Sequence, residues 1–144
     1  MKGNSSKNIK AAITAVGGFV PNDFISNQDL EKVLDTTDEW ITTRTGIKKR
    51  RILQGEGKGT SYLAIKAAED VITKRNIDPA TIDLVIVATI TPDYKGAATA
   101  PSVASAIKAN NAYAFDLSAA CSGFLYGMST ATSYIESGRY KKVL

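Results

Sequence analysis

Cys121 is the residue of this chain whose surroundings best suit covalent chemistry. It lies in the segment FDLSAACSGFLY, residues 115–126, where a buried strand is predicted to run into a turn of small residues and then a helix. That order is typical of a nucleophile elbow, which holds a reactive side chain at the edge of a sheet and at a helix N-terminus. The helix N–H groups would stabilise a thiolate and could donate to an oxyanion. The alternative is a small buried hydrophobic residue, the usual role of a free cysteine.

Histidine is absent from the 144 residues. This excludes a histidine metal site and any cysteine–histidine or serine–histidine pair within the chain, so a base for Cys121 would have to come from elsewhere. A single cysteine cannot form an intramolecular disulfide, and a lone thiol is typical of a reducing compartment. We therefore expect a cytoplasmic protein with no metal site.

Trp40, the only tryptophan, lies in a polar stretch that leads into a basic one. An aromatic ring beside Arg44 and the run KKRR (residues 48–51) could stack on a nucleotide base and neutralise its phosphates. The alternative is a core tryptophan next to a solvated basic loop, and the local pattern favours that alternative.

Two other segments invite a phosphate or nucleic-acid interpretation. The segment GEGKGT, residues 55–60, follows no predicted strand and lacks the spacing of a phosphate-binding loop, so it is interpreted as a flexible loop. The basic run 48–51 has no interleaved aromatic residues, which is weak support for a nucleic-acid patch.

The elements that would position these residues alternate between strand and helix. Residues 82–90, IDLVIVATI, form a nearly continuous apolar run, which is typical of a parallel strand covered on both faces. Residues 60–76 place alanine, valine and isoleucine on one helical face. The predicted order is strand 10–19, helix 27–34 capped at 26 or 27, helix 37–43, loop 46–59, helix 60–76, strand 82–90, helix 101–108, strand 112–117, helix 121–137 and a strand from 141 to 144. This order predicts an α/β layered fold with a mainly parallel sheet.

Composition excludes several classes of protein. The chain is 44% hydrophobic and 22% charged, as in an ordinary globular domain. Its net charge of +4 is mild and its lysines are spread out, whereas nucleic-acid binders concentrate charge in one stripe. No stretch reaches the roughly 18 apolar residues of a membrane span. We expect no nucleic-acid or membrane partner, and an anionic small ligand or an acidic protein suits the charge.

The segments DTTDEWITTRTGIKKR (residues 35–50) and AFDLSAACSGF (residues 114–124) together resemble β-ketoacyl-acyl-carrier-protein synthase III. Residues 89–93 and 136–144 are also similar to that family, and the similarity covers nearly the whole chain from Lys10 onward. The resemblance implies the first of two αβαβα halves of a thiolase-like fold, with the C-terminal half absent and the chain ending inside a strand. Residues 1–144 would then be one N-terminal half.

The resemblance also implies a reaction. Cys121 would take the acyl group of an acyl-CoA as a thioester, and its backbone N–H would be one oxyanion donor. Malonyl-acyl carrier protein would decarboxylate, and its carbanion would attack that thioester. Trp40 would stack on the adenine of coenzyme A, with Thr36 and Arg44 near the nucleotide end, which reverses the local interpretation of Trp40. Coenzyme A is substrate here, no cofactor is implied, and a homodimer is expected.

The family's catalytic histidine and asparagine lie in the other half. We therefore expect that the 144 residues alone do not catalyse condensation. The alternatives are a related condensing enzyme that makes a secondary metabolite, and a non-catalytic acyl-CoA-binding or dimer-partner fragment.

One departure from the family pattern concerns Gly96. Where the family has a bulky residue that limits the partner's primer pocket, an ungapped alignment places Gly96. A larger pocket and a primer longer than acetyl would follow. A competing alignment, which needs an insertion and a later deletion, pairs residues 101–104 with the motif instead.

Overall fold

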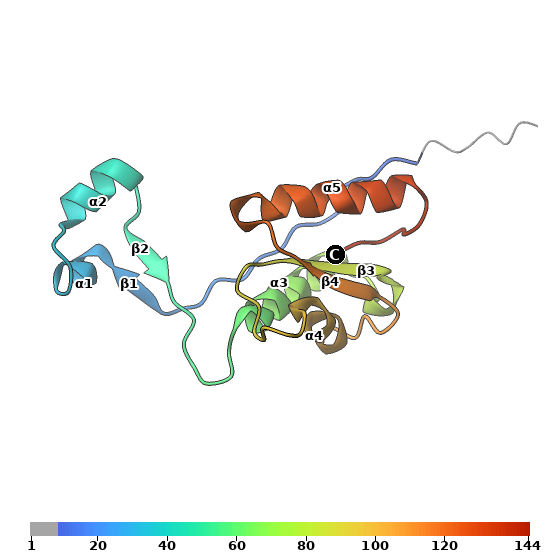
Figure 1. Cartoon of the computed structure of the whole chain (residues 1–144), viewed down its shortest axis with the longest axis horizontal. Helices are drawn as coiled ribbons and strands as arrows, with labels where there is room; N and C mark the ends of the chain where they lie inside the picture. The colour runs from blue at the N-terminus through green and yellow to red at the C-terminus, as the bar shows by residue number, and fades with distance from the viewer. Residues whose placement is uncertain (1–8) are drawn as a thin grey trace, which may run out of the picture. The chain divides into compact units, whose positions relative to one another are not determined.

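The computed structural model describes residues 9–144, which divide into two compact units. One unit is residues 20–58. The other combines residues 9–19 with residues 59–144. Each unit has its own strands and helices (Figure 1).

The unit of residues 20–58 is a two-stranded antiparallel hairpin with two short helices. Its elements are β1 (Phe24–Ser26), α1 (Asn27–Glu31), α2 (Asp38–Thr45) and β2 (Lys49–Arg51). Phe24 pairs with Arg51 and Ser26 with Lys49. Thr37 caps the first turn of α2 by accepting from the Trp40 N–H, and Gly46 ends the helix in a left-handed conformation.

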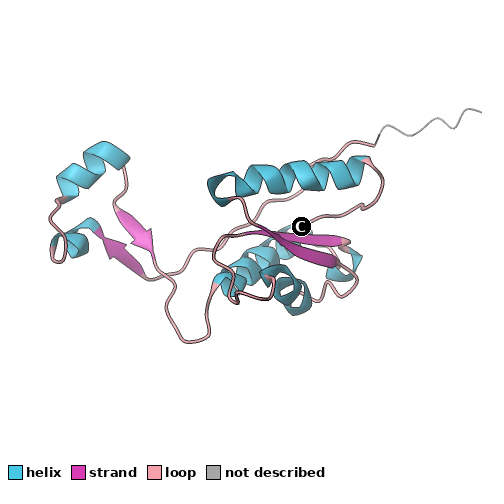
Figure 2. Cartoon of the chain, viewed as in Figure 1, coloured by secondary structure: helices cyan, strands magenta, loops and turns pink. Residues whose placement is uncertain are grey.

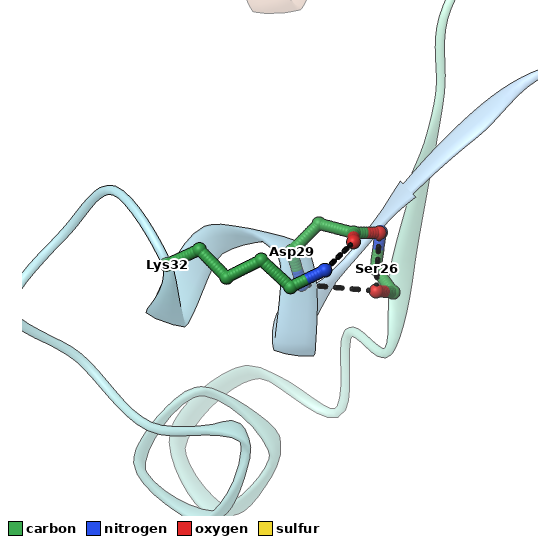
Figure 3. A network of polar contacts seen from close by, with 3 residues as sticks. All are labelled: Ser26, Asp29 and Lys32. Atoms are coloured by element: carbon green, nitrogen blue, oxygen red, sulfur yellow. Dashed lines mark hydrogen bonds and ion pairs between the residues drawn. The ribbon is translucent and has the colours of Figure 1, made fainter.

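Helix α1 begins with a reciprocal cap, drawn in Figure 3. The Ser26 hydroxyl accepts from the Asp29 N–H, while the Asp29 carboxylate accepts from the Ser26 N–H and from Lys32 Nζ at 2.7 Å. These bonds hold the pKa of Asp29 well below its ordinary range, the Lys32 bond contributing most. Ser26 is thus the cap that the sequence indicated as one of two possibilities.

The other unit is built on two parallel strands, as the apolar runs predict. Its elements are α3 (Thr60–Arg75), β3 (Leu84–Ala88), α4 (Thr99–Ala106), β4 (Tyr113–Leu117) and α5 (Gly123–Glu136), with 3-10 turns at Pro79–Thr81 and Ala120–Ser122. The two strands lie side by side in the sheet (Figure 2). Leu84 pairs with Tyr113 and Ala88 with Leu117. Val143 forms a parallel bridge with Leu84 on the other edge of β3, so the predicted last strand is present as a single bridge.

Helices cover both faces of this sheet, which explains the continuous apolar run of β3. Helices α3 and α4 lie on one side and α5 on the other (Figure 1). The core between α3, α4 and the strands consists of small and branched side chains: Ala68, Ile82, Val85, Ala100, Val103, Ala104, Ile107 and Ala109. The alanines let the helices approach the strands closely. Among residues 9–144, no helix is both long and apolar enough to cross a membrane.

The predicted strand over residues 10–19 is wrong. The segment is extended but unpaired, and Ile13 and Val16 are 68% and 73% exposed. It is held by a helix instead. A β-carbon on Gly17 would lie 2.6 Å from Val71 Cγ2 of α3, and the Gly18 N–H donates to the Asp70 carboxylate at 3.0 Å. A close approach of backbone to helix replaces the strand pairing that the sequence pattern predicts.

The predicted loop over residues 46–59 is also partly wrong, because it contains β2, and β1 was not predicted. Neither strand has the alternation of apolar and polar residues that marks a strand in sequence; β2 reads Lys-Arg-Arg. Helix α5 begins at Gly123 rather than residue 121, because a 3-10 turn precedes it. The other predicted helices and strands are present, with ends that differ by up to three residues.

Candidate active site

The predicted elbow at Cys121 is formed by the chain as it leaves the sheet. Strand β4 ends at Leu117, alongside the end of β3. Cys121 follows within the 3-10 turn Ala120–Ser122, and α5 begins two residues later. The side chain of Cys121 is exposed, so it is not the buried hydrophobic residue of the alternative interpretation. Ligands of α/β sheets bind at the carboxyl ends of the strands, which is where this thiol lies.

Small residues are required on both sides of Cys121. Ala120 has a φ of +44°, in the left-handed region that side chains with a β-carbon rarely adopt. Gly123 is buried, and a β-carbon there would lie 3.1 Å from the Ala88 side chain at the end of β3. The Ser122 N–H donates to the Ala119 carbonyl at 3.0 Å and closes the turn. The turn therefore presents Cys121 at the start of α5, with little room for a larger neighbour.

Asp116 is a site-forming residue that the sequence analysis missed. Its carboxylate accepts from the Thr99 and Ala100 N–H groups, both at 2.7 Å, and so caps α4, whose own N-cap residue Ala98 offers no side-chain bond. One strand residue thereby fixes the start of α4 and the loop that leads into it. The available signal was a single carboxylate within an apolar strand segment, which needs a partner when it is half-buried.

Gly96 lies in that loop, in the same compact unit as Cys121. The loop is exposed and is turned by an antiparallel bridge between Tyr94 and Ala97. A β-carbon on Gly96 would meet nothing within 4 Å, and its φ is not in the left-handed region. A β-carbon at this position therefore meets no steric obstacle in this chain.

The residues expected at the nucleotide end of coenzyme A lie in the unit of residues 20–58. Trp40 is 52% exposed, so the interpretation of Trp40 as a core residue is wrong. Arg44, one helical turn further along α2, places its guanidinium carbon 4.5 Å from the centre of the Trp40 ring. Thr36 is half-buried directly before the α2 cap, and its N–H donates to the Leu34 carbonyl at 3.0 Å. An exposed aromatic plate with a cation beside it suits a planar, anionic ligand.

The basic run beyond α2 is partly used within its own unit. Arg50 Nη1 donates to Asn27 Oδ1 at 2.6 Å, and Arg51 Nη1 donates to the carbonyls of Pro21 and Asn22, both at 3.0 Å. Two of the four cations are therefore engaged in holding the hairpin, which agrees with the weak case for a nucleic-acid patch.

Comparison with known proteins identifies the arrangement. The family model for 3-oxoacyl-[acyl-carrier-protein (ACP)] synthase III matches residues 115–144. The β-ketoacyl-[acyl-carrier-protein] synthase III of Chlorobaculum tepidum is 54% identical over 94% of the chain, and that match spans 41% of the relative. Over nearly its whole length the chain is similar to β-ketoacyl-[acyl-carrier-protein] synthase III. It spans about two-fifths of the length of the curated relatives it matches.

Two solved structures with similar folds confirm the predicted fold class. The 3-oxoacyl-[acyl-carrier-protein] synthase III of Aquifex aeolicus has a TM-score of 0.87 and 46% identity over 94% of the chain and 42% of its own length. The priming β-ketosynthase of the R1128 polyketide pathway has a TM-score of 0.87 and 34% identity over 97% of the chain and 42% of its own length. The α/β fold of the chain is thus the one found in the matched parts of both structures.

Proposed function

We propose that Cys121 is the acyl-carrying nucleophile of a β-ketoacyl-acyl-carrier-protein synthase III, which condenses an acyl-CoA primer with malonyl-acyl carrier protein. The observation that carries the proposal is the exposed thiol at the start of α5, at the carboxyl edge of the parallel strands, in a chain 54% identical to a named synthase III.

Two steps follow from the thiol. The Cys121 thiolate attacks the carbonyl carbon of the acyl-CoA thioester, a C–S bond to Cys121 forms, the bond to the coenzyme A sulfur breaks, and coenzyme A leaves as its thiolate. Decarboxylation of the malonyl group then releases CO₂ and leaves a carbanion, which attacks the acyl carbon on Cys121, so that a C–C bond forms and the thiolate is regenerated. The Cys121 N–H, at the start of a helix, would stabilise the oxyanion of each step.

The nucleotide end of coenzyme A would bind α2. Its adenine would stack on the exposed Trp40 ring. Arg44 and Thr36 would contact the phosphates and ribose, and the Arg44 guanidinium carbon lies 4.5 Å from the centre of the Trp40 ring. No cofactor is needed, because the thioester substrates carry the reactive carbon. A homodimer and a cytoplasmic location are part of the same proposal.

We infer that the 144 residues alone do not catalyse condensation. Carbanion formation needs a proton donor or a cation beside the malonyl carbonyl, and the family uses a histidine and an asparagine there. The chain has no histidine, so the histidine of that pair would have to come from residues outside it.

A second candidate is priming of a secondary-metabolite pathway by the same chemistry. The observation that favours it is Gly96, which leaves the loop free of a bulky side chain. A polyketide priming synthase has the same TM-score of 0.87 as the Aquifex aeolicus synthase III, so the fold is compatible with both candidates. The two candidates differ in the acyl group and the acceptor, not in the role of Cys121.

The test is intact mass spectrometry of the native protein before and after incubation with a mixture of acyl-CoAs. An acyl adduct that is lost in Cys121→Ser supports the proposal, and its mass names the primer. The control for the thiol is alkylation at neutral pH, which acyl-CoA should slow. A thiol that takes no acyl group and reacts no more slowly with acyl-CoA present would favour the non-catalytic partner interpretation.

A further inference from the structure

Asn27 is the one polar side chain that is fully buried in the unit of residues 20–58, and its bond to Arg50 is only one of several. Its exposed fraction is 0%. Its amide nitrogen donates to Asp38 Oδ1 at 2.7 Å and to the Ile47 carbonyl at 2.8 Å, and lies 3.3 Å from Thr42 Oγ1. A buried amide with this many partners is costly to leave unpaired, so its geometry is tightly determined.

Those three acceptors span the whole of α2. Asp38 is its first residue, Thr42 lies in its middle, and Ile47 follows its C-terminal Gly46. The Thr42 hydroxyl also bonds Asp38 Oδ1 at 3.2 Å, which closes the set. The Asn27 side chain, which belongs to α1, therefore forms hydrogen bonds to the beginning, the middle and the end of the neighbouring helix α2.

The other side of Asn27 is tied to β2. Its Oδ1 accepts from Arg50 Nη1 at 2.6 Å, and its backbone N–H donates to the Lys48 carbonyl at 3.2 Å. Because β2 pairs with β1, the amide joins the hairpin to both helices. Sliding or rotating α2 would break several of these bonds at once.

Asn27 bonds the side of α2 that is opposite the exposed Trp40 ring. Successive helical residues are rotated by about 100°, so Trp40 lies about 200° from Asp38 around the axis. Thr42 lies one turn after Asp38 on the side bonded to Asn27, and Arg44 lies one turn after Trp40 on the exposed side. The rotation of α2 about its own axis, which Asn27 determines, therefore decides where Trp40 and Arg44 point.

We propose that Asn27 is the positioning residue for the nucleotide end of the coenzyme A site: it fixes the rotation of α2 so that Trp40 and Arg44 face the ligand. The inference rests on the proposed function, because it takes Trp40 and Arg44 as that site. Asn27 itself does not touch the ligand.

The experiment uses Trp40, the only tryptophan of the chain, as the reporter. Coenzyme A is titrated into the purified protein, and the quenching of Trp40 fluorescence gives its dissociation constant. Asn27→Leu keeps the branched shape of the side chain, is somewhat larger, and makes none of the side-chain bonds. The dissociation constant should therefore rise by about tenfold or more, with a changed emission maximum in the free protein. Gln28→Ala, the exposed neighbour, should bind as wild type does.

A second pair of variants separates positioning from stability. Asn27→Asp places a carboxylate against Asp38 and should weaken binding further, because like charges then face each other. Asn27→Asp combined with Asp38→Asn exchanges donor and acceptor across the 2.7 Å contact and should restore part of the affinity. Ser26→Ala destabilises α1 of the same unit without touching α2, and should leave the affinity of the folded protein unchanged.

The outcomes distinguish the positioning role of Asn27 from the proposed nucleotide site itself. If wild type binds coenzyme A and folded Asn27→Leu binds it equally well, the positioning role is overturned and the nucleotide site stands. Equal losses in Ser26→Ala and Asn27→Leu would also overturn it, since they would show a general effect of stability. Wild type that does not quench with coenzyme A overturns both the site and the positioning role.

Discussion

The side chain of Ala88, at the end of β3, lies 3.1 Å from where a β-carbon on Gly123 would be. Gly123 is the first residue of α5, and Cys121 precedes it by two residues. The depth at which α5 sits on the sheet therefore depends on a glycine next to an alanine. The contact between Gly123 and Ala88 therefore helps to set the position of the Cys121 thiol at the edge of the sheet.

Gly123→Val should displace the start of α5. Its side chain would overlap Ala88, and overpacking of this kind costs about 1–3 kcal/mol of unfolding free energy. Acylation or alkylation of Cys121 should also slow, because the turn before the helix must shift. Urea unfolding and the alkylation rate check the two effects. Gly127→Ala is the matched control: it lies in the same helix, a β-carbon there meets nothing within 4 Å, and it should be neutral or stabilising by up to about 1 kcal/mol. Equal stability of Gly123→Val and wild type would contradict the packing argument.

Asp116→Asn should loosen the start of α4. The amide has one acceptor oxygen for two N–H donors at 2.7 Å, and its own NH₂ group faces one of them. The expected loss is about 1–3 kcal/mol of unfolding free energy, measured by urea unfolding. Glu69→Gln removes an exposed carboxylate paired with Lys66 on α3 and should change the stability by less than about 1 kcal/mol. The prediction fails if both variants lose the same small amount.

The cap on α1 should be sensitive to acid. The pKa of Asp29 lies below its ordinary value of 3.8 in the folded chain, chiefly because of the Lys32 bond and then the Ser26 bonds. The charged form therefore stabilises the fold above that ordinary value, and this contribution is lost as the pH falls through the lower folded pKa. Wild type should exceed Asp29→Asn in stability at pH 6, and the difference should shrink below about pH 4. Urea unfolding followed through Trp40 fluorescence, in the same unit, measures it. A difference that stays constant from pH 6 to pH 2 would show that ionisation of Asp29 is irrelevant.

The open position at Gly96 should govern primer length. In the native enzyme we expect acyl-CoAs longer than acetyl to be used, and Gly96→Phe should shift the preference toward acetyl-CoA by about tenfold or more, since one methylene can carry such a ratio. Rates measured over a series of acyl-CoAs provide the test. Gly96→Ala adds only a methyl group, for which the structure has space, and should keep the wild-type preference. A strong preference of the wild-type enzyme for acetyl-CoA would contradict the hypothesis that Gly96 allows longer primers.

Local pattern was sufficient for several elements of the unit that contains Cys121. The apolar run of β3, the alanine face of α3 and the small residues after β4 each carry a signal within a dozen residues of chain, and all three elements are present. The motif residues between 35 and 50, with those between 114 and 124, were also enough to indicate a resemblance that the curated relatives confirm.

Sequence reasoning failed where a neighbour distant in the chain decides the structure. The segment 10–19 has the composition of a strand, yet Gly17 and Gly18 are held by Val71 and Asp70, more than fifty residues away. Strand β2 is three cations, and it is a strand only because β1 supplies the pairing. A carboxylate in β4 gives no local sign that it caps α4.

The sequence by itself determined the chemistry available to this protein: one thiol in a turn of small residues, one tryptophan followed by an arginine at helical spacing, and no histidine. These depend on residue types and short spacings, which the chain carries directly. Tertiary structure alone decided that Trp40 is exposed, that Gly123 rests on Ala88 and that Asn27 is buried against α2. Burial and hydrogen bonding are properties of pairs of segments, and a pair exists only after the chain has brought them together.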